Sequence, residues 1–305
     1  MGRVLLGLAL SLGCGGSNPE WESPQDAGDA DTDSDSDSAS TSDTASDSES
    51  DSDTPSDTGS DDSRSEGCGK GGATGLRDES LDVAGVTRTY LFSVPEGYDA
   101  DVALPLIFGW HGAGGRGEDS RNHIRVEQAS AGAAIFVYPD ALPLPGFAAG
   151  WELDEAGRDV ALFDALLELV SSDYCVDLGR VFSYGFSFGG YFSNSLGCFR
   201  ADRLLAIAPI AGGGPPGGCE GTVSVWIAHN QDDDVVAFAE GETARDHWLV
   251  SNACGAESAP VDPAPCVEYG GCEEGRRVVF CAPETGGHGS HGYAGAAVWN
   301  FFTVR

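Results

Sequence analysis

Between residues 88 and 302 the chain alternates between apolar runs of strand length and longer runs with a helical apolar stripe. Residues 104–110 (LPLIFGW) are apolar throughout, as in a strand buried on both faces, whereas residues 158–172 repeat apolar side chains at helical spacing. Alternation of this kind predicts an α/β fold in which a mostly parallel sheet carries helices on both faces. The expected strands are 88–94, 104–110, 134–139, 180–185, 204–212, 223–229 and 276–281, and the expected helices are 158–172, 188–200, 243–250 and 293–302.

The segment before this domain has a different composition. Residues 15–66 are low-complexity Ser, Asp and Thr, with 17 acidic residues against one basic residue, Arg64, between positions 20 and 66. Such a segment buries too little apolar surface to offset the entropy of folding, so we expect a disordered acidic tether followed by a folded domain of residues 67–305. The formal net charge of −33 argues against nucleic-acid and anionic-membrane partners, which are bound through Lys and Arg.

The first residues have the features of an export signal. Arg3 precedes an apolar stretch, residues 4–13, which is too short to span a bilayer and is followed by Cys14. Residues 1–14 resemble a bacterial lipoprotein signal, which is cleaved before a cysteine that becomes lipidated, although Ser11 stands where such signals usually have Leu. The resemblance predicts that a lipid on Cys14 is the only membrane contact and holds the protein at the cell surface or the periplasmic face. The alternative is ordinary signal cleavage followed by secretion.

Eight cysteines remain when Cys14 is set aside. An even number in an exported protein predicts up to four disulfides, and the 105 possible pairings leave the connectivity open. No C-x-x-C pair is present, so neither a zinc ribbon nor a thioredoxin-type site is predicted. The stretch 251–275 contains three prolines and three cysteines and is expected to be a disulfide-stapled excursion from the sheet.

The sequence Gly185-Phe186-Ser187-Phe188-Gly189 directly follows a predicted strand and directly precedes a predicted helix. This context is typical of a nucleophile elbow, a turn so tight that only small residues fit two positions either side of the serine. The helix behind the turn brings backbone N–H groups and the positive end of its dipole near the serine. We therefore predict that Ser187 is a nucleophile. The alternative is a glycine-rich turn with an inert serine.

A serine hydroxyl becomes a good nucleophile only when a base takes its proton, and after a nucleophile elbow the acid and the histidine follow in the chain. His288 lies in a glycine-flanked loop after the last predicted strand and is the expected base, with His291 as the alternate. A metal site built on this pair would lack a third ligand, so no metal is predicted. Three adjacent aspartates follow the preceding strand, and the residues alone leave open whether the acid is Asp232, Asp233 or Asp234.

Attack on a carbonyl also requires two backbone N–H donors for the oxyanion that forms. One is expected from Phe188, the residue after the serine. The other is expected from the glycine-rich loop after strand 104–110, at Gly112 or Ala113.

From residue 67 onward the sequence resembles the α/β-hydrolase esterases grouped as polyhydroxybutyrate depolymerases and feruloyl esterases (carbohydrate esterase family one). The resemblance covers the whole domain in order and implies an α/β-hydrolase fold. It rests on GCGK (67–70), RTYLFSVPEGYD (88–99), PLIFGWHGAGG (105–115), VYPDAL (137–142), the Trp151 to Val160 stretch, YCVDLGRVFSYGFSFGG (174–190), WIAHNQDDDVV (226–236) and TGGHG (285–289).

Position by position, the resemblance implies that Asp233 is the acid and His288 the base. The pieces that end at Cys254 and Cys272 match cysteine-containing pieces of the family, which implies a disulfide between them. The chain departs from the family at Asn230, where glycine is usual. It departs again directly after the nucleophile, where a phenylalanine replaces a small residue or Asn.

The implied activity is hydrolysis of a carboxylic ester by a serine nucleophile, without a metal or organic cofactor. The expected substrate is a polysaccharide-linked ester of the feruloyl type or a short polyester. The alternatives are depolymerisation of 3-hydroxybutyrate oligomers and a non-enzymatic binding module on the same fold. No signal for an oligomeric state is present. The candidates to line the substrate pocket are Trp110, His111, Trp151, Phe186 and Tyr191.

Overall fold

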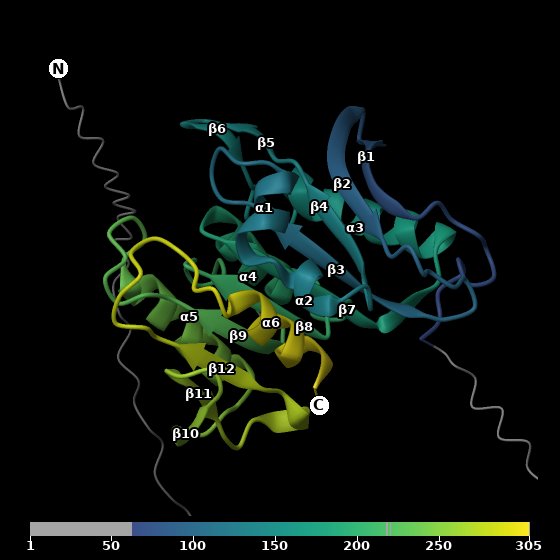
Figure 1. Ribbon diagram of the computed structural model, residues 1–305. Coiled ribbons are helices and arrows are strands. Elements are labelled where there is room, and N and C mark those ends of the chain that lie inside the picture. Colours follow the sequence, from purple (N-terminus) through teal and green to yellow (C-terminus); the bar gives the residue numbers. More distant parts are fainter. Residues whose placement is uncertain (1–62, 218, 220, 305) are drawn as a thin grey trace, which may run out of the picture. The chain divides into compact units, whose positions relative to one another are not determined.

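The structure, a computed structural model, describes residues 63–217, 219 and 221–304. Its centre is a ten-stranded sheet with the strand order β1-β2-β4-β3-β7-β8-β9-β12-β11-β10 (Figure 1). The strands are β1 (Gly75–Val83), β2 (Val86–Val94), β3 (Leu104–Trp110), β4 (Ile135–Pro139), β7 (Val176–Phe186), β8 (Ala206–Ile210), β9 (Ser224–Ala228), β10 (Ser258–Val261), β11 (Cys266–Tyr269) and β12 (Val278–Cys281). Two short strands, β5 (Leu142–Leu144) and β6 (Phe147–Gly150), form a separate hairpin.

The strands from β4 to β12 in this order pair parallel to one another, and the strands at both ends of the sheet pair antiparallel. The central strands β3 and β4 are buried almost throughout, as expected for continuous apolar runs between two helical layers. Because parallel strands share one direction, the loops after β3, β7, β9 and β12 all leave the sheet at the carboxyl ends of its strands. This side of the sheet is called the carboxyl edge.

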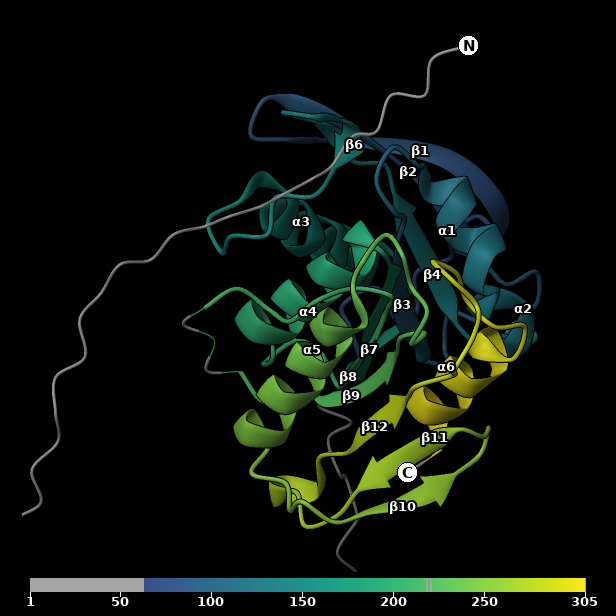
Figure 2. The same cartoon turned by 90° about the vertical axis from the view of Figure 1, so that its left-hand side faces the viewer.

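Helices cover both faces of the sheet (Figure 2). One apolar core lies under α3, α4 and α5, and a second lies under α1, α2 and α6. The predicted fold, a mostly parallel sheet between two helical layers, is confirmed. The helices are α1 (Gly117–Ile124), α2 (Val126–Ser130), α3 (Arg158–Asp173), α4 (Phe188–Phe199), α5 (Phe238–Ser251) and α6 (Ala294–Thr303), with a short 3₁₀ helix η1 (Glu273–Gly275).

Several elements have no counterpart in the sequence analysis. β1 reads GLRDESLDV, and its residues alternate between half-buried and exposed, so it lacks the apolar run of a central strand. The excursion at 251–275 also contains two strands, β10 and β11, which extend the sheet beyond β12. The hairpin β5–β6 and the helices α1 and α2 are short and carry weak apolar patterns.

The folded part begins earlier than residue 67. Ser65 is buried, its N–H donates to the carbonyl of Val176 (2.9 Å), and its Oγ donates to the carbonyl of Tyr174 (2.7 Å). These contacts tie the chain to the start of β7 and correct the expected boundary between tether and domain. The predicted signal, Cys14 and the tether up to residue 62 lie outside the described residues.

Four disulfides join the eight cysteines of the domain, and they are Cys68–Cys175, Cys198–Cys219, Cys254–Cys272 and Cys266–Cys281. The Cys254–Cys272 bridge is the one that the resemblance implied. Within the described part of the chain, no helix has both the length and the apolar character needed to cross a bilayer.

Candidate active site

Ser187 occupies the turn between β7 and α4 in a strained backbone conformation, with φ at 55° and ψ at −118°. Its N–H donates to the carbonyl of Ile210 (2.9 Å), which fixes the turn against the end of β8. A side chain at Gly185 would overlap the carbonyl of Gly189, and one at Gly189 would overlap the carbonyl of Trp110. Both glycines are therefore required by close backbone contact.

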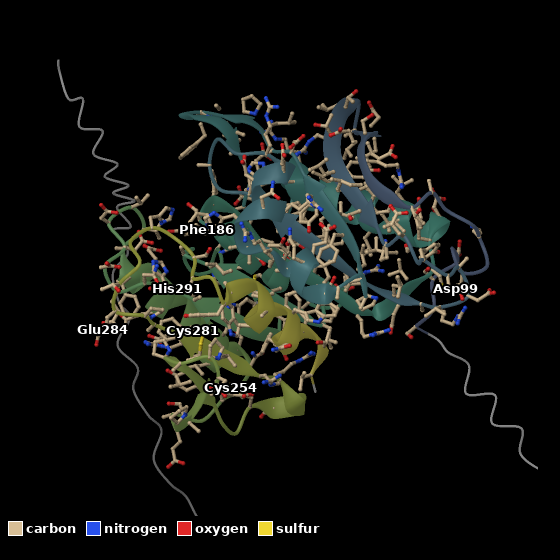
Figure 3. The ribbon with its side chains drawn as sticks, in the orientation of Figure 1. Asp99, Phe186, Cys254, Cys281, Glu284 and His291 are labelled. Carbon is tan, nitrogen blue, oxygen red and sulfur yellow. A yellow bond between two sulfur atoms is a disulfide. The ribbon has the colours of Figure 1, made fainter. Side chains whose placement is uncertain are left out.

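The structure brings Ser187, His288 and Asp233 into one hydrogen-bonded line. His288 Nε2 lies 2.9 Å from Ser187 Oγ, and His288 Nδ1 lies 2.8 Å from Asp233 Oδ2. Ser187 follows β7, Asp233 follows β9 and His288 follows β12, so the parallel sheet delivers all three side chains to one edge. Phe186 and His291 lie at this edge, far from Asp99 in the loop before β3 (Figure 3).

Asp233 is buried, and both of its carboxylate oxygens accept hydrogen bonds. Its Oδ1 accepts hydrogen bonds from the N–H groups of Val235 and Val236, both at 2.9 Å. Burial alone would raise the pKa of Asp233, but the hydrogen bond from His288 and the two backbone amides outweigh it and hold the pKa below its usual value. The carboxylate is therefore ionised and aimed at the imidazole.

The other candidates have different partners. Asp232 Oδ1 accepts the N–H of Gly287 (2.7 Å), and Asp234 is exposed. His291 Nε2 contacts Asn230 Oδ1 (2.9 Å) rather than a serine or an aspartate. The geometry thus separates Asp233 from its two neighbours and His288 from His291.

A further histidine at the site was missed by the sequence analysis. His229 directly follows β9, is buried, and its Nε2 lies 2.9 Å from the carbonyl of Val236 and 3.4 Å from Asp233 Oδ2. It therefore braces the turn that holds Asp233. The only sign of this role in the sequence was the position of His229 directly after an apolar strand. A histidine that is simply buried in the core can occupy the same position.

The loop after β3 lies against Ser187 and is held rigidly. His111 is buried and links this loop to the chain at Ala141. Its Nδ1 donates to the carbonyl of Gly112 (2.7 Å), and its Nε2 accepts the N–H of Ala141 (3.0 Å). Burial, the largest influence, holds the pKa of His111 below its usual value, which suits this neutral tautomer. Trp151 Nε1 donates to the carbonyl of His111 (2.9 Å) from the other side.

The backbone N–H groups of Phe188, Gly112 and Ala113 all remain available for an oxyanion. No acceptor for any of the three is found among the described residues. A Cβ at Gly112 would lie 3.4 Å from Ser187 Cβ, so this loop passes directly beside the nucleophile. The arrangement has the parts needed to stabilise a tetrahedral intermediate.

No family model matches the chain. Among known proteins, feruloyl esterase D of Neurospora crassa is 35% identical over 239 residues, which cover 71% of this chain and 79% of that protein. The probable feruloyl esterase C of Aspergillus terreus is 33% identical over 260 residues, which cover 79% of this chain and 92% of that protein. The chain belongs to the feruloyl esterase family.

Solved structures of esterases share the fold of this feruloyl esterase family member. The acetyl xylan esterase from Aspergillus awamori superimposes with a TM-score of 0.60 at 13% identity, covering 76% of this chain and 100% of that one. The feruloyl esterase module from Clostridium thermocellum has a TM-score of 0.55 at 13% identity, covering 74% and 86%. The fold is that of the α/β-hydrolases, and the protein is a carboxylic ester hydrolase.

Two of the expected pocket residues belong to the core of the esterase. Trp110 and Trp151 are buried and pack edge to face with ring centroids 5.1 Å apart. Trp110 is the last residue of β3, and its side chain points into the core under α4, where it meets Phe192. Their assignment to the pocket was wrong, because closeness in sequence to a site loop does not fix the direction of a side chain.

The half-buried aromatic residues stand at the site itself. The Phe186 ring lies 4.9 Å from the His288 ring and 4.3 Å from the His123 ring. The Phe188 ring packs edge to face on Phe147 from the β5–β6 hairpin (5.1 Å). The sequence analysis did not predict Phe147 and His123 at the site, because the hairpin β5–β6 and helix α1 are short and have only a weak apolar pattern.

Of the two remaining pocket candidates, His111 is buried beneath the loop after β3 and does not line a pocket. Tyr191 lies in the first turn of α4 and is half-buried. Burial and the neighbouring carboxylate of Glu240 raise the pKa of its hydroxyl. Tyr191 therefore stays protonated and can act as a hydrogen-bond donor at neutral pH.

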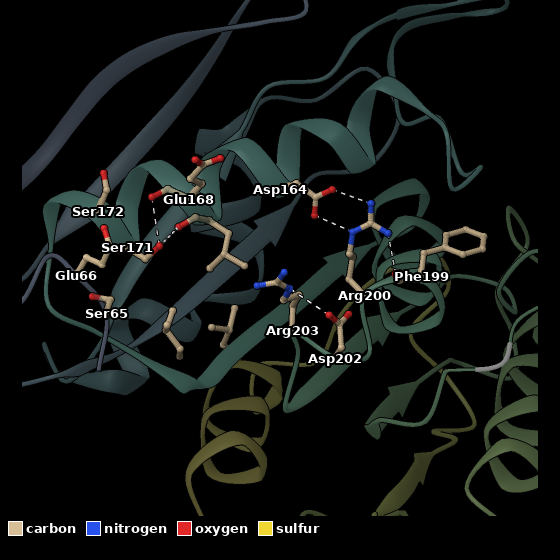
Figure 4. A pocket seen from close by; sticks show the side chains of 13 residues that line it. Ser65, Glu66, Asp164, Glu168, Ser171, Ser172, Phe199, Arg200, Asp202 and Arg203 are labelled. Atoms are coloured by element: carbon tan, nitrogen blue, oxygen red, sulfur yellow. Dashed lines mark hydrogen bonds and ion pairs between the residues drawn. The ribbon is translucent and has the colours of Figure 1, made fainter. Parts of the chain in front are cut away.

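The esterase also has a large hollow away from this site. About 880 Å³ in volume, it lies beside the first half of β7 at Leu178 and Val181, whereas Ser187 follows the last residue of that strand. Arg200 spans part of it in a doubly hydrogen-bonded ion pair with Asp164, both bonds at 2.7 Å (Figure 4). Arg203 and Asp202, which also line the hollow, form a second ion pair (3.1 Å).

Proposed function

We propose that the protein is a feruloyl esterase that hydrolyses hydroxycinnamoyl esters of plant polysaccharides through an acyl-enzyme on Ser187. The observation that carries the proposal is the line from Ser187 Oγ through His288 to Asp233, with hydrogen bonds of 2.9 and 2.8 Å. The names of its relatives, feruloyl esterases D and C, support this acyl group.

In the first step, Ser187 Oγ attacks the ester carbonyl carbon while its proton moves to His288 Nε2. The carbonyl oxygen becomes an oxyanion within reach of the N–H groups of Phe188 and the Gly112–Ala113 loop. The carbon–oxygen bond to the alcohol then breaks, and the alcohol leaves with the proton from His288. Asp233 stabilises the imidazolium that exists between these events.

In the second step, water attacks the carbonyl carbon of the acyl-enzyme and gives a proton to His288 Nε2. The bond to Ser187 Oγ breaks, and the serine regains a proton from the imidazole. The carboxylic acid is released and the starting state is restored. All proton transfers in the scheme use His288, and the same N–H groups stabilise both oxyanions.

The aromatic side chains around Ser187 support an aromatic acyl group. Phe186, Phe188 and Phe147 present partly exposed rings from β7, α4 and the β5–β6 hairpin. A planar cinnamoyl group can pack against such rings in offset or edge-to-face geometry.

The substrate proposal is tested by comparing methyl ferulate with 3-hydroxybutyrate oligomers and short acyl esters. We expect kcat/KM to be highest for methyl ferulate, because only its acyl group has an aromatic ring that can pack against Phe147, Phe186 and Phe188. A higher kcat/KM for 3-hydroxybutyrate oligomers would contradict the feruloyl assignment while leaving ester hydrolysis intact. Absence of turnover on all three would contradict the enzymatic proposal.

We also propose that the protein is exported and held at the membrane by a lipid on Cys14. The four disulfides support an oxidising compartment. Expression in a bacterial host with labelled palmitate is expected to label the wild-type protein in the membrane fraction. The Cys14→Ser variant is expected to be unlabelled. A wild-type protein that is exported without label would contradict the anchor.

A further inference from the structure

The loop that carries His288 is held by side chains that the reaction scheme does not use. Asn230 Nδ2 donates to the carbonyl of Gly287 (2.9 Å) and to the carbonyl of Gly289 (3.1 Å). These residues immediately precede and follow His288, so one amide group is hydrogen-bonded to the backbone on both sides of the histidine. Asn230 is only 3% exposed, so water competes poorly for these bonds.

A second side chain binds the other backbone polar group of Gly287. Asp232 Oδ1 accepts the N–H of Gly287 at 2.7 Å, while the carbonyl of Gly287 is bound by Asn230. Both backbone polar groups of Gly287 are thus bound by residues of the loop after β9. That loop also carries Asp233, so the acid and the base share one support.

The orientation of the Asn230 amide is set by His291. His291 Nε2 donates to Asn230 Oδ1 (2.9 Å), which leaves the amide nitrogen facing the two carbonyls. The His291 ring is itself stacked on Tyr293, with centroids 5.2 Å apart and planes 9° from parallel. The histidine that was the alternate candidate for the base therefore supports the loop of His288.

The backbone of this loop depends on outside support. Gly286 has φ at 147° and Gly287 has φ at 55°, and glycine occupies such conformations without preferring them over others. A Cβ at Gly286 would lie 2.5 Å from Asn230 Nδ2, so the asparagine fills the space that a side chain would otherwise take. Without Asn230 the loop would have a hole beside it, the carbonyl of Gly289 would lose its partner, and the carbonyl of Gly287 would keep only the N–H of Gly289 (3.0 Å).

We propose that Asn230 is a positioning residue that sets the distance between His288 Nε2 and Ser187 Oγ, with His291 and Asp232 completing the support. The proposal rests on the proposed function, since it assumes that His288 is the base. It assigns a role to the asparagine at which the sequence departs from the family pattern that it resembles. It predicts that loss of Asn230 lowers the rate of acylation and leaves the binding of substrate nearly unchanged.

The main test is Asn230→Asp in the full chain. The carboxylate has the same shape and still accepts from His291, but it has no donor for the two carbonyls. We expect kcat for methyl ferulate to fall about 10- to 100-fold, as for a misplaced reacting group, with little change in KM. His291→Phe keeps a ring against Tyr293 and removes the donor to Asn230, so we expect a smaller loss of kcat in the same direction.

The matched control is Gln231→Ala. Gln231 is the next residue, and its Nε2 donates to the carbonyl of Ala282, which does not flank His288. We expect this variant to keep the wild-type kcat. A loss equal to that of Asn230→Asp would mean that any change in the loop after β9 impairs the enzyme, and the proposal would be wrong.

Two readouts separate positioning from general stability. The low-field proton resonance of His288 Nδ1–H, shared with Asp233, is expected in the wild-type protein and is expected to be shifted or lost in folded Asn230→Asp. A purely structural role would lower Tm and leave kcat per folded molecule and this resonance unchanged, which would overturn the proposal. If Asn230→Asp does not fold, His291→Phe decides by the same two readouts. If the wild type hydrolyses no ester, the proposed function fails, and the resonance still tests the positioning.

Discussion

Replacing Ser187 with alanine is expected to lower kcat for methyl ferulate by about 10⁶-fold, as for removal of a nucleophile that acts as one unit with its base. Ser187 Oγ has His288 as its hydrogen-bond partner, so the substitution removes the attacking atom and leaves the surrounding packing in place. Tm should therefore change little. The N–H groups expected to bind the oxyanion and the aromatic side chains near the serine remain, so substrate binding should persist.

The control for this variant is Ser172→Ala. Ser172 lies near the end of α3, and its Oγ donates to the carbonyl of Leu169, far along the chain from the turn after β7. We expect its kcat to equal that of the wild type. Measurable turnover by Ser187→Ala at a substantial fraction of the wild-type rate would rule out an acyl-enzyme on this serine.

Asp233→Asn is expected to lower kcat by about 10⁴-fold, the cost of holding the base in the wrong tautomer. The N–H groups of Val235 and Val236 fix one position of the side chain as an acceptor, so the Asn oxygen would occupy it. The Asn NH₂ would then face His288 Nδ1 and force the imidazole proton onto Nε2. An imidazole in that state cannot accept the proton of Ser187.

The neighbouring aspartates give matched comparisons for this variant. Asp234 is exposed, and Asp234→Asn should keep the wild-type rate. Asp232→Asn weakens the support of Gly287 and should cause a smaller loss than Asp233→Asn. A larger loss in either variant than in Asp233→Asn would contradict the assignment of the acid.

The position of the serine was predictable because local constraints determine it. The turn between β7 and α4 has no room for side chains at Gly185 and Gly189. The two glycines at this spacing around the serine are visible in the sequence. The choice among three adjacent aspartates was not predictable from the residues, because it depends on contacts with a loop 55 residues away in the chain. Only the resemblance to known esterases separated them.

Support from distant parts of the chain was invisible in the sequence. Trp151 was expected in the pocket, yet it is buried and donates to the carbonyl of His111. Asn230 was noted only as a departure from the family, and its three hydrogen bonds depend on the path of the loop after β12. Such supporting roles can be recognised only when the positions of both hydrogen-bonding partners are known.

The central strands and helices were predictable, whereas the edges of the sheet were not. β3 and α3 bury continuous or periodic apolar residues, and their signals are strong. β1 is half-exposed along its length, and β10 contains a proline, so neither has the pattern of a buried strand. These outer strands are stabilised mainly by backbone pairing with their neighbours, β1 with β2 and β10 with β11.

The most direct test of the account is to identify the acyl-enzyme. The full chain is mixed with methyl ferulate, quenched in acid before steady state, digested and analysed by mass spectrometry, with Ser187→Ala treated in parallel. We predict one feruloyl group on the peptide that contains Ser187 in the wild type and none in the variant. A feruloyl group on any other residue, or turnover by the wild type with Ser187 unmodified under conditions where deacylation is slow, would contradict the account.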